Sequence, residues 1–145
     1  MIQRIQTIFL LLAALCFGAL FMLPMATSSV STAHFMADQV YGIQDHLALL
    51  GITTFAIGVS VLAIVLFKNR KLQRKLVFLI IVLAISMSVT SYFLLKMDLG
   101  ESILTAGLHL QPGMFLPFLG ILFSLLAGYY IGKDEKLVKS MDRLR

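Results

Sequence analysis

The residues whose types could do chemistry are three histidines and a few carboxylates outside the long apolar stretches of the chain. Imidazole nitrogens and carboxylate oxygens are good zinc ligands. His34 and Asp38 would share one face if their segment were helical. The spacing matches no standard zinc site, however, so we expect solvated loop side chains. The residues concerned are His34, His46, His109, Asp38, Asp45, Asp98 and Glu101.

Sequence motifs of known catalytic chemistry are missing. The chain has no G-x-S-x-G, no H-E-x-x-H, no phosphate-binding loop and no C-x-x-C. Its apolar segments also lack the mid-membrane ionisable group that is typical of a proton-coupled transporter. We therefore predict that the protein is not an enzyme and has no catalytic, metal-binding or cofactor-binding residue and no cofactor.

The elements that must position any site are four apolar segments without Asp, Glu, Lys or Arg. As helices they would each be roughly 27–32 Å long, about the thickness of the hydrocarbon core of a bilayer. This predicts an all-α fold, a four-helix transmembrane bundle that forms one domain over residues 1–145. The predicted spans are residues 7–25, 47–67, 76–95 and 114–131.

Positive charge is divided unevenly between the two sides of these segments. Of the twelve Lys and Arg residues, only Lys96 lies on the side opposite to the others. Cytoplasmic loops of membrane proteins carry an excess of Lys and Arg. We therefore predict that both termini are cytoplasmic (N-in/C-in), with outside loops at 26–46 and 96–113, a cytoplasmic loop at 68–75 and a cytoplasmic tail at 132–145.

Local signals suggest where the helices end. The first helix should begin near Ile2 and end at Leu23, because a proline disfavours helix in the residue before it. Its apolar run is longer than a usual signal-peptide core, so we expect it to be retained. Asp45 is a plausible N-cap of the second helix, and the third helix should end near Leu95. Residues 34–43 could form a short strand or a helical turn.

The net charge of +5 comes from basic residues that border apolar spans. This pattern favours contact with the lipid bilayer and its anionic headgroups, and we predict no nucleic-acid partner. The basic turn in the middle of the chain orients the protein in this interpretation, and a docking site for an acidic partner is the alternative. Its residues are Lys68, Arg70, Lys71, Arg74 and Lys75.

Small residues recur every four positions in the last apolar segment, at Gly120, Ser124, Gly128 and Gly132. Such residues share one face of a helix and let helix backbones approach closely in lipid. The ordinary interpretation is packing within the bundle. The alternative is a docking face for a second copy of the chain or for another membrane protein.

The C-terminal tail carries a narrow apolar stripe. Leu137, Met141 and Leu144 recur at i, i+4 and i+7 among charged residues, the pattern of a short amphipathic helix at a cytoplasmic membrane surface. We expect this helix to continue the fourth span and to meet either headgroups or another protein. Glu135 can pair with Lys139 along it.

Three segments of the chain resemble one family. They are residues 1–7 (MIQRIQT), 67–73 (FKNRKLQ) and 133–138 (KDEKLV), the last followed by DRLR at 142–145. The chain resembles, from end to end, the small bacterial integral-membrane family called domain of unknown function 4293, which is associated with Bacteroidetes. The resemblance implies four spans, an uncleaved first helix and a multi-pass protein of the inner membrane. It implies no activity, ligand or catalytic residue.

Three functions remain open at this point. The favoured hypothesis is a non-catalytic structural or accessory subunit of an envelope complex, since the chain is small and has motif-like cytoplasmic ends. The alternative is a small transport or lipid-handling protein, which is suggested only by the hydroxyls of the third segment, Ser86, Ser88, Thr90 and Ser91. A membrane enzyme is the least supported, since no acid, base or nucleophile constellation is visible.

Overall fold

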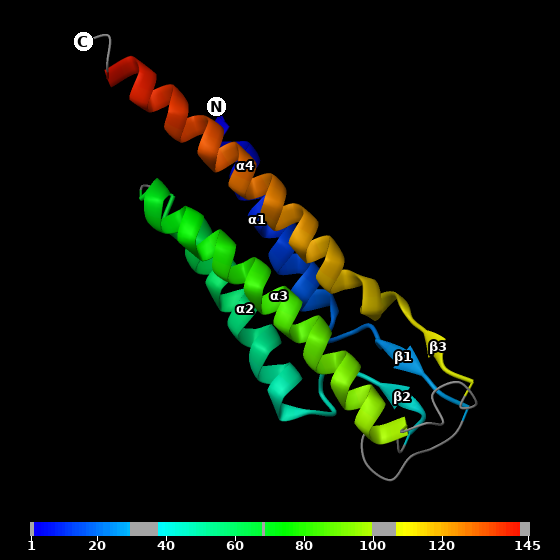
Figure 1. Ribbon diagram of the computed structural model, residues 1–145. Coiled ribbons are helices and arrows are strands. Elements are labelled where there is room, and N and C mark those ends of the chain that lie inside the picture. Colours follow the sequence, from blue (N-terminus) through cyan, green and yellow to red (C-terminus); the bar gives the residue numbers. More distant parts are fainter. Residues whose placement is uncertain (1, 30–37, 68, 100–106, 143–145) are drawn as a thin grey trace.

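The computed structural model describes residues 2–29, 38–67, 69–99 and 107–142, which form a bundle of four helices (Figure 1). The predicted helical class is confirmed for these residues, and each predicted apolar segment contributes to one helix. A 3-10 helix, η2 (Pro112–Phe115), leads into the last helix. The helices are α1 (Ile2–Ala19), α2 (Leu47–Val65), α3 (Arg70–Leu99) and α4 (Leu116–Asp142).

The four helices form a closed ring. α1 packs against α2, α2 against α3 and α3 against α4, and α4 packs against α1. Successive helices run in opposite directions, as in an up-and-down bundle (Figure 1). The C-terminal end of α4 extends beyond the ends of the other three helices (Figure 1). That end of the chain therefore has only part of its surface covered by the bundle.

The interior of the bundle is mostly apolar, and partly buried aromatic rings lie between two of its helices. Between α1 and α4, the ring centroid of Phe9 lies 5.5 Å from that of Tyr130 and 6.5 Å from that of Phe123. Such stacked aromatic pairs add specific geometry to the burial of apolar area. The fully buried apolar side chains of the helices include Leu10, Ala13, Phe17, Leu49, Ala63, Ile80, Ala84, Met87, Ala127 and Ile131.

The outward faces of all four helices are apolar as well. Large apolar side chains on each helix are about half exposed, although a water-soluble monomer rarely shows a continuous apolar surface of this extent. This is the distribution expected for helices that are surrounded by lipid. The exposed residues include Ile8, Leu11 and Leu15 on α1, Phe55 and Val65 on α2, Phe78, Val82, Ile85 and Val89 on α3, and Phe118, Leu122 and Leu125 on α4.

Three of the described helices are long and apolar enough to cross a membrane: α2, α3 and the stretch Pro112–Val138 that contains most of α4. The apolar part of α1, Ile5–Ala19, is shorter. Length and composition therefore identify three membrane-crossing candidates, and the role of α1 depends on how it packs with them.

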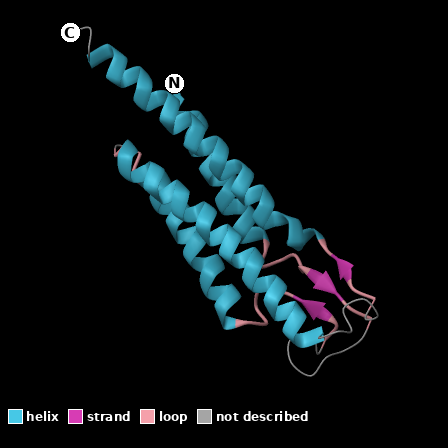
Figure 2. Cartoon of the chain, viewed as in Figure 1, coloured by secondary structure: helices cyan, strands magenta, loops and turns pink. Residues whose placement is uncertain are grey.

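A small three-stranded sheet closes one end of the bundle (Figure 2). Its strands are β1 (Ala26–Thr27), β2 (Val40–Tyr41) and β3 (His109–Leu110), and β1 pairs antiparallel with both of the others. The all-α prediction did not include this sheet, but β2 lies in the segment 34–43, where a short strand was one of the two predicted alternatives. Strands of two residues are too short to leave the alternating pattern by which a sequence reveals a strand.

Several helix ends differ from the predicted ones. α1 ends at Ala19, four residues before Leu23, and hydrogen-bonded turns replace its last predicted turn. His46, rather than Asp45, caps α2, because its Nδ1 accepts a hydrogen bond from the amide of Ala48 at 3.1 Å. Asp45 instead accepts a hydrogen bond from the amide of Gly42.

α3 extends past the predicted third span in both directions. It begins at Arg70, inside the predicted loop, and continues to Leu99, beyond the expected end near Leu95. α4 continues without a break through Gly132 to Asp142. Some predicted residues fall outside the described part of the chain, namely His34, Lys68, Glu101 and Leu144 and the side chains of Lys139 and Met141.

Candidate functional site

The basic start of α3 and an acidic turn of α4 form two ion pairs at one end of the bundle. Arg70 Nε lies 3.1 Å from Asp134 Oδ2, and Arg74 Nη2 lies 2.6 Å from Glu135 Oε2. The carboxylate side chains are only 13% and 15% exposed, whereas that of Arg74 is 53% exposed. We call these four residues the ion-pair cluster.

The N-terminus of α3 explains why acidic partners are favourable here. Its first turn contains Arg70 and Lys71 and no acidic residue, although the positive end of a helix dipole favours negative charge. The two carboxylates of α4 supply that charge from outside the helix. Asn69 caps the N-terminus of α3, since its Oδ1 accepts a hydrogen bond from the amide of Leu72 at 3.2 Å.

Glu135 forms an ion pair that the sequence did not predict. It was predicted to pair with Lys139 along one helix, and in the structure it pairs with Arg74 of a different helix. The side chain of Lys139 lies outside the described part of the chain. α4 runs beside the start of α3, where Arg74 can reach the carboxylate. The basic segment is therefore not a free turn at this point but is joined to the tail.

Two buried glutamines lie at the same end of the bundle, and sequence reasoning missed both. Gln73 Nε2 donates a hydrogen bond to the carbonyl of Ala63 at 3.0 Å, which ties α3 to the end of α2. Gln6 is 1% exposed, and neither atom of its amide has a hydrogen-bond partner among the described residues. The signal in the sequence that could have drawn attention to Gln6 is its position directly before an apolar run.

An open groove of about 410 Å³ lies between α3 and α4 next to the ion-pair cluster. One wall is Arg74 of α3, and the other is a stretch of α4 that combines glycines, an aromatic ring and two lysines. The groove therefore has an apolar half and a cationic half. The residues that line it are Arg74, Gly128, Tyr129, Gly132, Lys133 and Lys136.

The predicted small-residue face of α4 contacts other helices of the same chain. A Cβ atom added to Gly120 would lie 2.7 Å from Phe17 Cζ of α1. Added to Gly128 or Gly132 it would lie 3.3 Å from Val77 Cγ1 or Arg74 Nη2 of α3. These glycines therefore allow α4 to approach both of its neighbours.

Between two of these glycines, Ser124 is fully buried, and its hydroxyl donates to the carbonyl of Gly120 at 2.7 Å. This bond satisfies the hydroxyl within α4 itself.

A family model described as Domain of unknown function (DUF4293) matches residues 2–144. The chain belongs to the DUF4293 family. The resemblance inferred from three sequence segments is thereby confirmed. No curated protein and no solved structure matches the chain. In this DUF4293 protein the ion-pair cluster joins two of those three segments, the basic one in the middle and the one near the C-terminus.

Three of the four hydroxyls singled out on α3 have hydrogen-bond partners within this DUF4293 protein. Ser86 and Ser88 donate hydrogen bonds to the carbonyls of Leu83 and Ala84, one turn earlier in the same helix. Ser91 is buried, and its hydroxyl lies 3.8 Å from the sulfur of Met25. The bonds of Ser86 and Ser88 satisfy these two hydroxyls within α3, which is the common arrangement in lipid-embedded helices.

Several of the described histidines and carboxylates at the sheet end have structural roles. His109 lies on β3, and His46 caps α2. The described residues contain no group of three or more His, Cys, Asp or Glu side chains that could hold a metal ion. Asp38 accepts a hydrogen bond from the amide of Val40, so it stabilises the start of β2.

Tyr41 is the most deeply buried polar ring at the sheet end, with no exposed surface. Its hydroxyl donates to the carbonyl of Ser91 at 3.5 Å, which joins β2 to α3. Burial raises the pKa of Tyr41 to about 12, so the hydroxyl stays protonated at neutral pH.

Proposed function

We propose that this DUF4293 protein is a non-catalytic, four-span protein of the inner membrane that serves as a structural or accessory subunit of a larger envelope complex. The observation that carries the proposal is the apolar outer surface shared by all four helices. A bundle with an apolar interior and an apolar exterior suits a lipid environment, because lipid removes the cost of exposing the outer side chains to water.

The packing of α1 supports its assignment as a fourth span. Its 18 residues correspond to about 27 Å of helix, close to the thickness of the hydrocarbon core. It packs against both α2 and α4, and its outward residues Ile8, Leu11 and Leu15 are each about half exposed. These neighbours support a position of α1 at the same depth as the longer helices.

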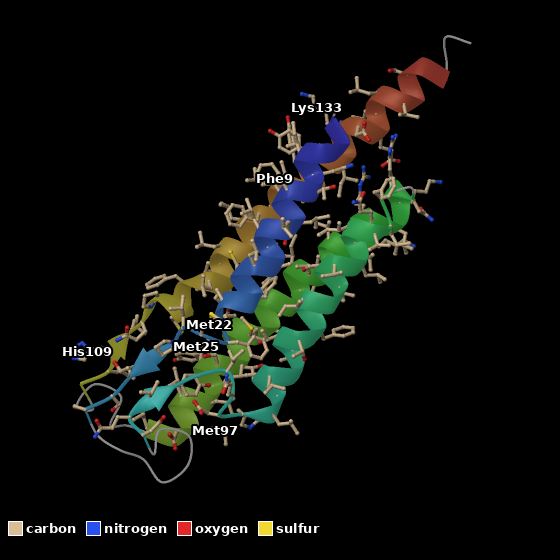
Figure 3. All side chains as sticks on the ribbon, turned by 180° about the vertical axis from the view of Figure 1, so that it is seen from behind. Phe9, Met22, Met25, Met97, His109 and Lys133 are labelled. Carbon is tan, nitrogen blue, oxygen red and sulfur yellow. The ribbon has the colours of Figure 1, made fainter. Side chains whose placement is uncertain are left out.

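The N-in/C-in topology is supported by the separation of charge along the bundle. Lys133 lies near the N-terminal end of α1, and His109 lies at the opposite end (Figure 3). Arg70, Lys71 and Arg74 are at the Lys133 end, where the ion-pair cluster forms. The positive-inside rule assigns that end to the cytoplasm.

Reporter fusions test this topology. Alkaline phosphatase fused after residue 145 should be inactive, and a cytoplasmic fluorescent reporter at the same site should be active. The same phosphatase inserted between residues 28 and 40 should be active. An active phosphatase after residue 145 would overturn the topology.

The accessory role is supported by the projecting end of α4 (Figure 1). Beyond the ion-pair cluster, Leu137 and Val138 are 44% and 38% exposed, although the neighbouring turns are charged. An apolar patch on a helix that extends past its own bundle suits contact with another protein at the cytoplasmic surface, either a membrane protein partner or a second copy of the chain.

The ion-pair cluster determines where a truncation must be placed to test this role. Ending the chain after Lys136 keeps both ion pairs and removes Leu137 and Val138, whereas ending it after Lys133 also removes both carboxylates. The first truncation should insert and fold normally but should migrate as a smaller complex on native gels of mild-detergent membrane extracts. An unchanged complex size would contradict the accessory role.

A small transport or lipid-handling protein remains the second candidate, and the groove between α3 and α4 is the observation that favours it. Ser86 and Ser88 of α3 donate their hydrogen bonds to carbonyls of their own helix. These hydroxyls are therefore not directed to a polar solute, and lipid is the better cargo. Reconstitution into vesicles with a fluorescent phospholipid tests this function. No acceleration of lipid exchange between the leaflets would exclude lipid translocation.

A further inference from the structure

We propose that the groove between α3 and α4 is a binding site for the headgroup of one anionic phospholipid, whose phosphate is held by Arg74, Lys133 and Lys136. The site rests on the membrane placement proposed above but requires neither the accessory role nor lipid transport. It differs from general attraction of headgroups to basic residues, because it assigns one lipid to one place on the bundle.

The shape of the groove comes from glycine. Gly128 and Gly132 present no side chain toward α3, and a Cβ at either would lie 3.3 Å from the nearest α3 side chain. Tyr129 borders the same space and is 66% exposed. The apolar half of the groove can therefore accept the glycerol and upper acyl region of a lipid beside an aromatic ring.

The groove also lies at the depth of a headgroup. The uncharged stretch of α4 ends at Gly132, and Lys133 is the first charged residue after it. Tyrosines such as Tyr129 and Tyr130 are enriched where membrane and water meet. One end of the groove thus borders the hydrocarbon region, and the other end enters the aqueous interface.

The charges in and around the groove favour an anion. Lys133 and Lys136 are exposed, and neither has an ion pair within the described part of the chain. Glu135 neutralises the charge of Arg74 through a contact at Nη2. A guanidinium has five N–H donors, and the side chain of Arg74 is 53% exposed, so donors remain for a second anion. The net excess is therefore that of the two lysines, which complements one phosphodiester.

An acidic protein segment would match the same charges. The apolar half of the groove decides between the two occupants, because a phospholipid supplies both an anion and an adjoining apolar region in one molecule. The expected ligand is an anionic phospholipid such as phosphatidylglycerol, and zwitterionic phosphatidylcholine should bind more weakly.

Native mass spectrometry of the full chain in detergent, at physiological ionic strength, tests the site. Phosphatidylglycerol should give one preferred bound lipid, and phosphatidylcholine should not. The double substitution Lys133→Gln and Lys136→Gln should weaken phosphatidylglycerol binding about 25-fold, since each basic residue near an anionic lipid contributes about 1 kcal/mol. Both side chains are exposed, so this variant should fold.

The matched control is Lys71→Gln with Lys75→Gln. It removes the same charge from the same end of the bundle, but neither side chain lines the groove. The control should change lipid affinity by less than about threefold, because exposed charges outside the site are screened by salt. An equal loss in both double variants would overturn the site in favour of unspecific attraction.

Two further measurements separate the remaining outcomes. Gly132→Leu fills the groove without changing charge and should also lose the bound lipid. Thermal unfolding in lipid-free detergent checks that this variant folds.

Displacement of the lipid by inorganic phosphate or by an oligoglutamate peptide would overturn the lipid assignment. A chain that stays in solution without detergent would refute the membrane placement itself, whereas a detergent-requiring chain without lipid selectivity would refute only the site.

Discussion

Arg70 in the first turn of α3 and Asp134 in the C-terminal half of α4 form an ion pair, with 3.1 Å between Nε and Oδ2. The pair joins a basic segment and a tail that are far apart in the sequence. Together with Arg74 and Glu135, it holds the continuation of α4 against the bundle. The part of α4 beyond this point extends past the other helices of the bundle (Figure 1).

The substitution Asp134→Ala should lower the free energy of unfolding by about 1–3 kcal/mol, between the values for an exposed and for a buried ion pair. The carboxylate is largely buried, and its removal leaves Arg70 without its partner. Thermal or denaturant unfolding in detergent measures the change. Asp134→Arg combined with Arg70→Asp should recover part of the loss, and no difference between Asp134→Ala and the parent would contradict a stabilising pair.

Gly120→Ala should destabilise the bundle by about 1–3 kcal/mol, the usual cost of overpacking. The new methyl group would lie 2.7 Å from Phe17 Cζ, so the ring or α4 must move. Gly58→Ala is the matched control, because a Cβ at Gly58 has nothing within 4 Å and alanine favours helix. Equal melting temperatures for the two variants would show that α1 and α4 are not closely packed at Gly120.

Gln6→Leu should stabilise the protein by about 1–3 kcal/mol, because it removes a buried amide whose polar atoms have no hydrogen-bond partner among the described residues. Gln73→Leu should have the opposite effect, since it removes the hydrogen bond to the carbonyl of Ala63. Chemical unfolding of both variants in the same detergent measures the difference. Destabilisation by Gln6→Leu would reveal a partner for the amide that forms in the membrane.

Tyr41 should make stability fall above pH 10. Its pKa is about 12 in the folded protein and near the ordinary value of 10.0 in the unfolded chain. Between these two values the unfolded chain has lost the phenolic proton and the folded protein has kept it. Stability from this group is therefore fully present below pH 10 and is lost as the pH rises toward 12.

The variant Tyr41→Phe removes this titration. It should be slightly less stable than the parent at pH 8, because the bond to the Ser91 carbonyl is lost, and the difference should shrink or reverse toward pH 12. Melting temperatures of both proteins between pH 8 and pH 12 measure this difference in stability. Lysine titration affects the parent and the variant equally, so it does not contribute to the difference. A parallel decline in parent and variant would place the hydroxyl in water.

The sequence alone determined the helical class of this chain and where its helices lie. A long run without charge satisfies its backbone internally when it forms a helix, whatever surrounds it, so each run predicted a helix regardless of its neighbours. The family followed from short segments that are recognisable without a structure. The repeat of Gly120, Ser124 and Gly128 marked one face of α4, because helical periodicity is a local property.

Tertiary structure decided which groups meet. The pairing of Arg70 with Asp134, the burial of Gln6 and the groove beside Lys133 depend on how α4 lies across α1 and α3, and no local pattern encodes that arrangement. The sheet at the other end arises from pairing between distant two-residue strands. The start of α3 has contributions of both kinds. Arg70 and Arg74 in its first turns pair with carboxylates of α4, whereas its cap, Asn69, is the residue directly before the helix.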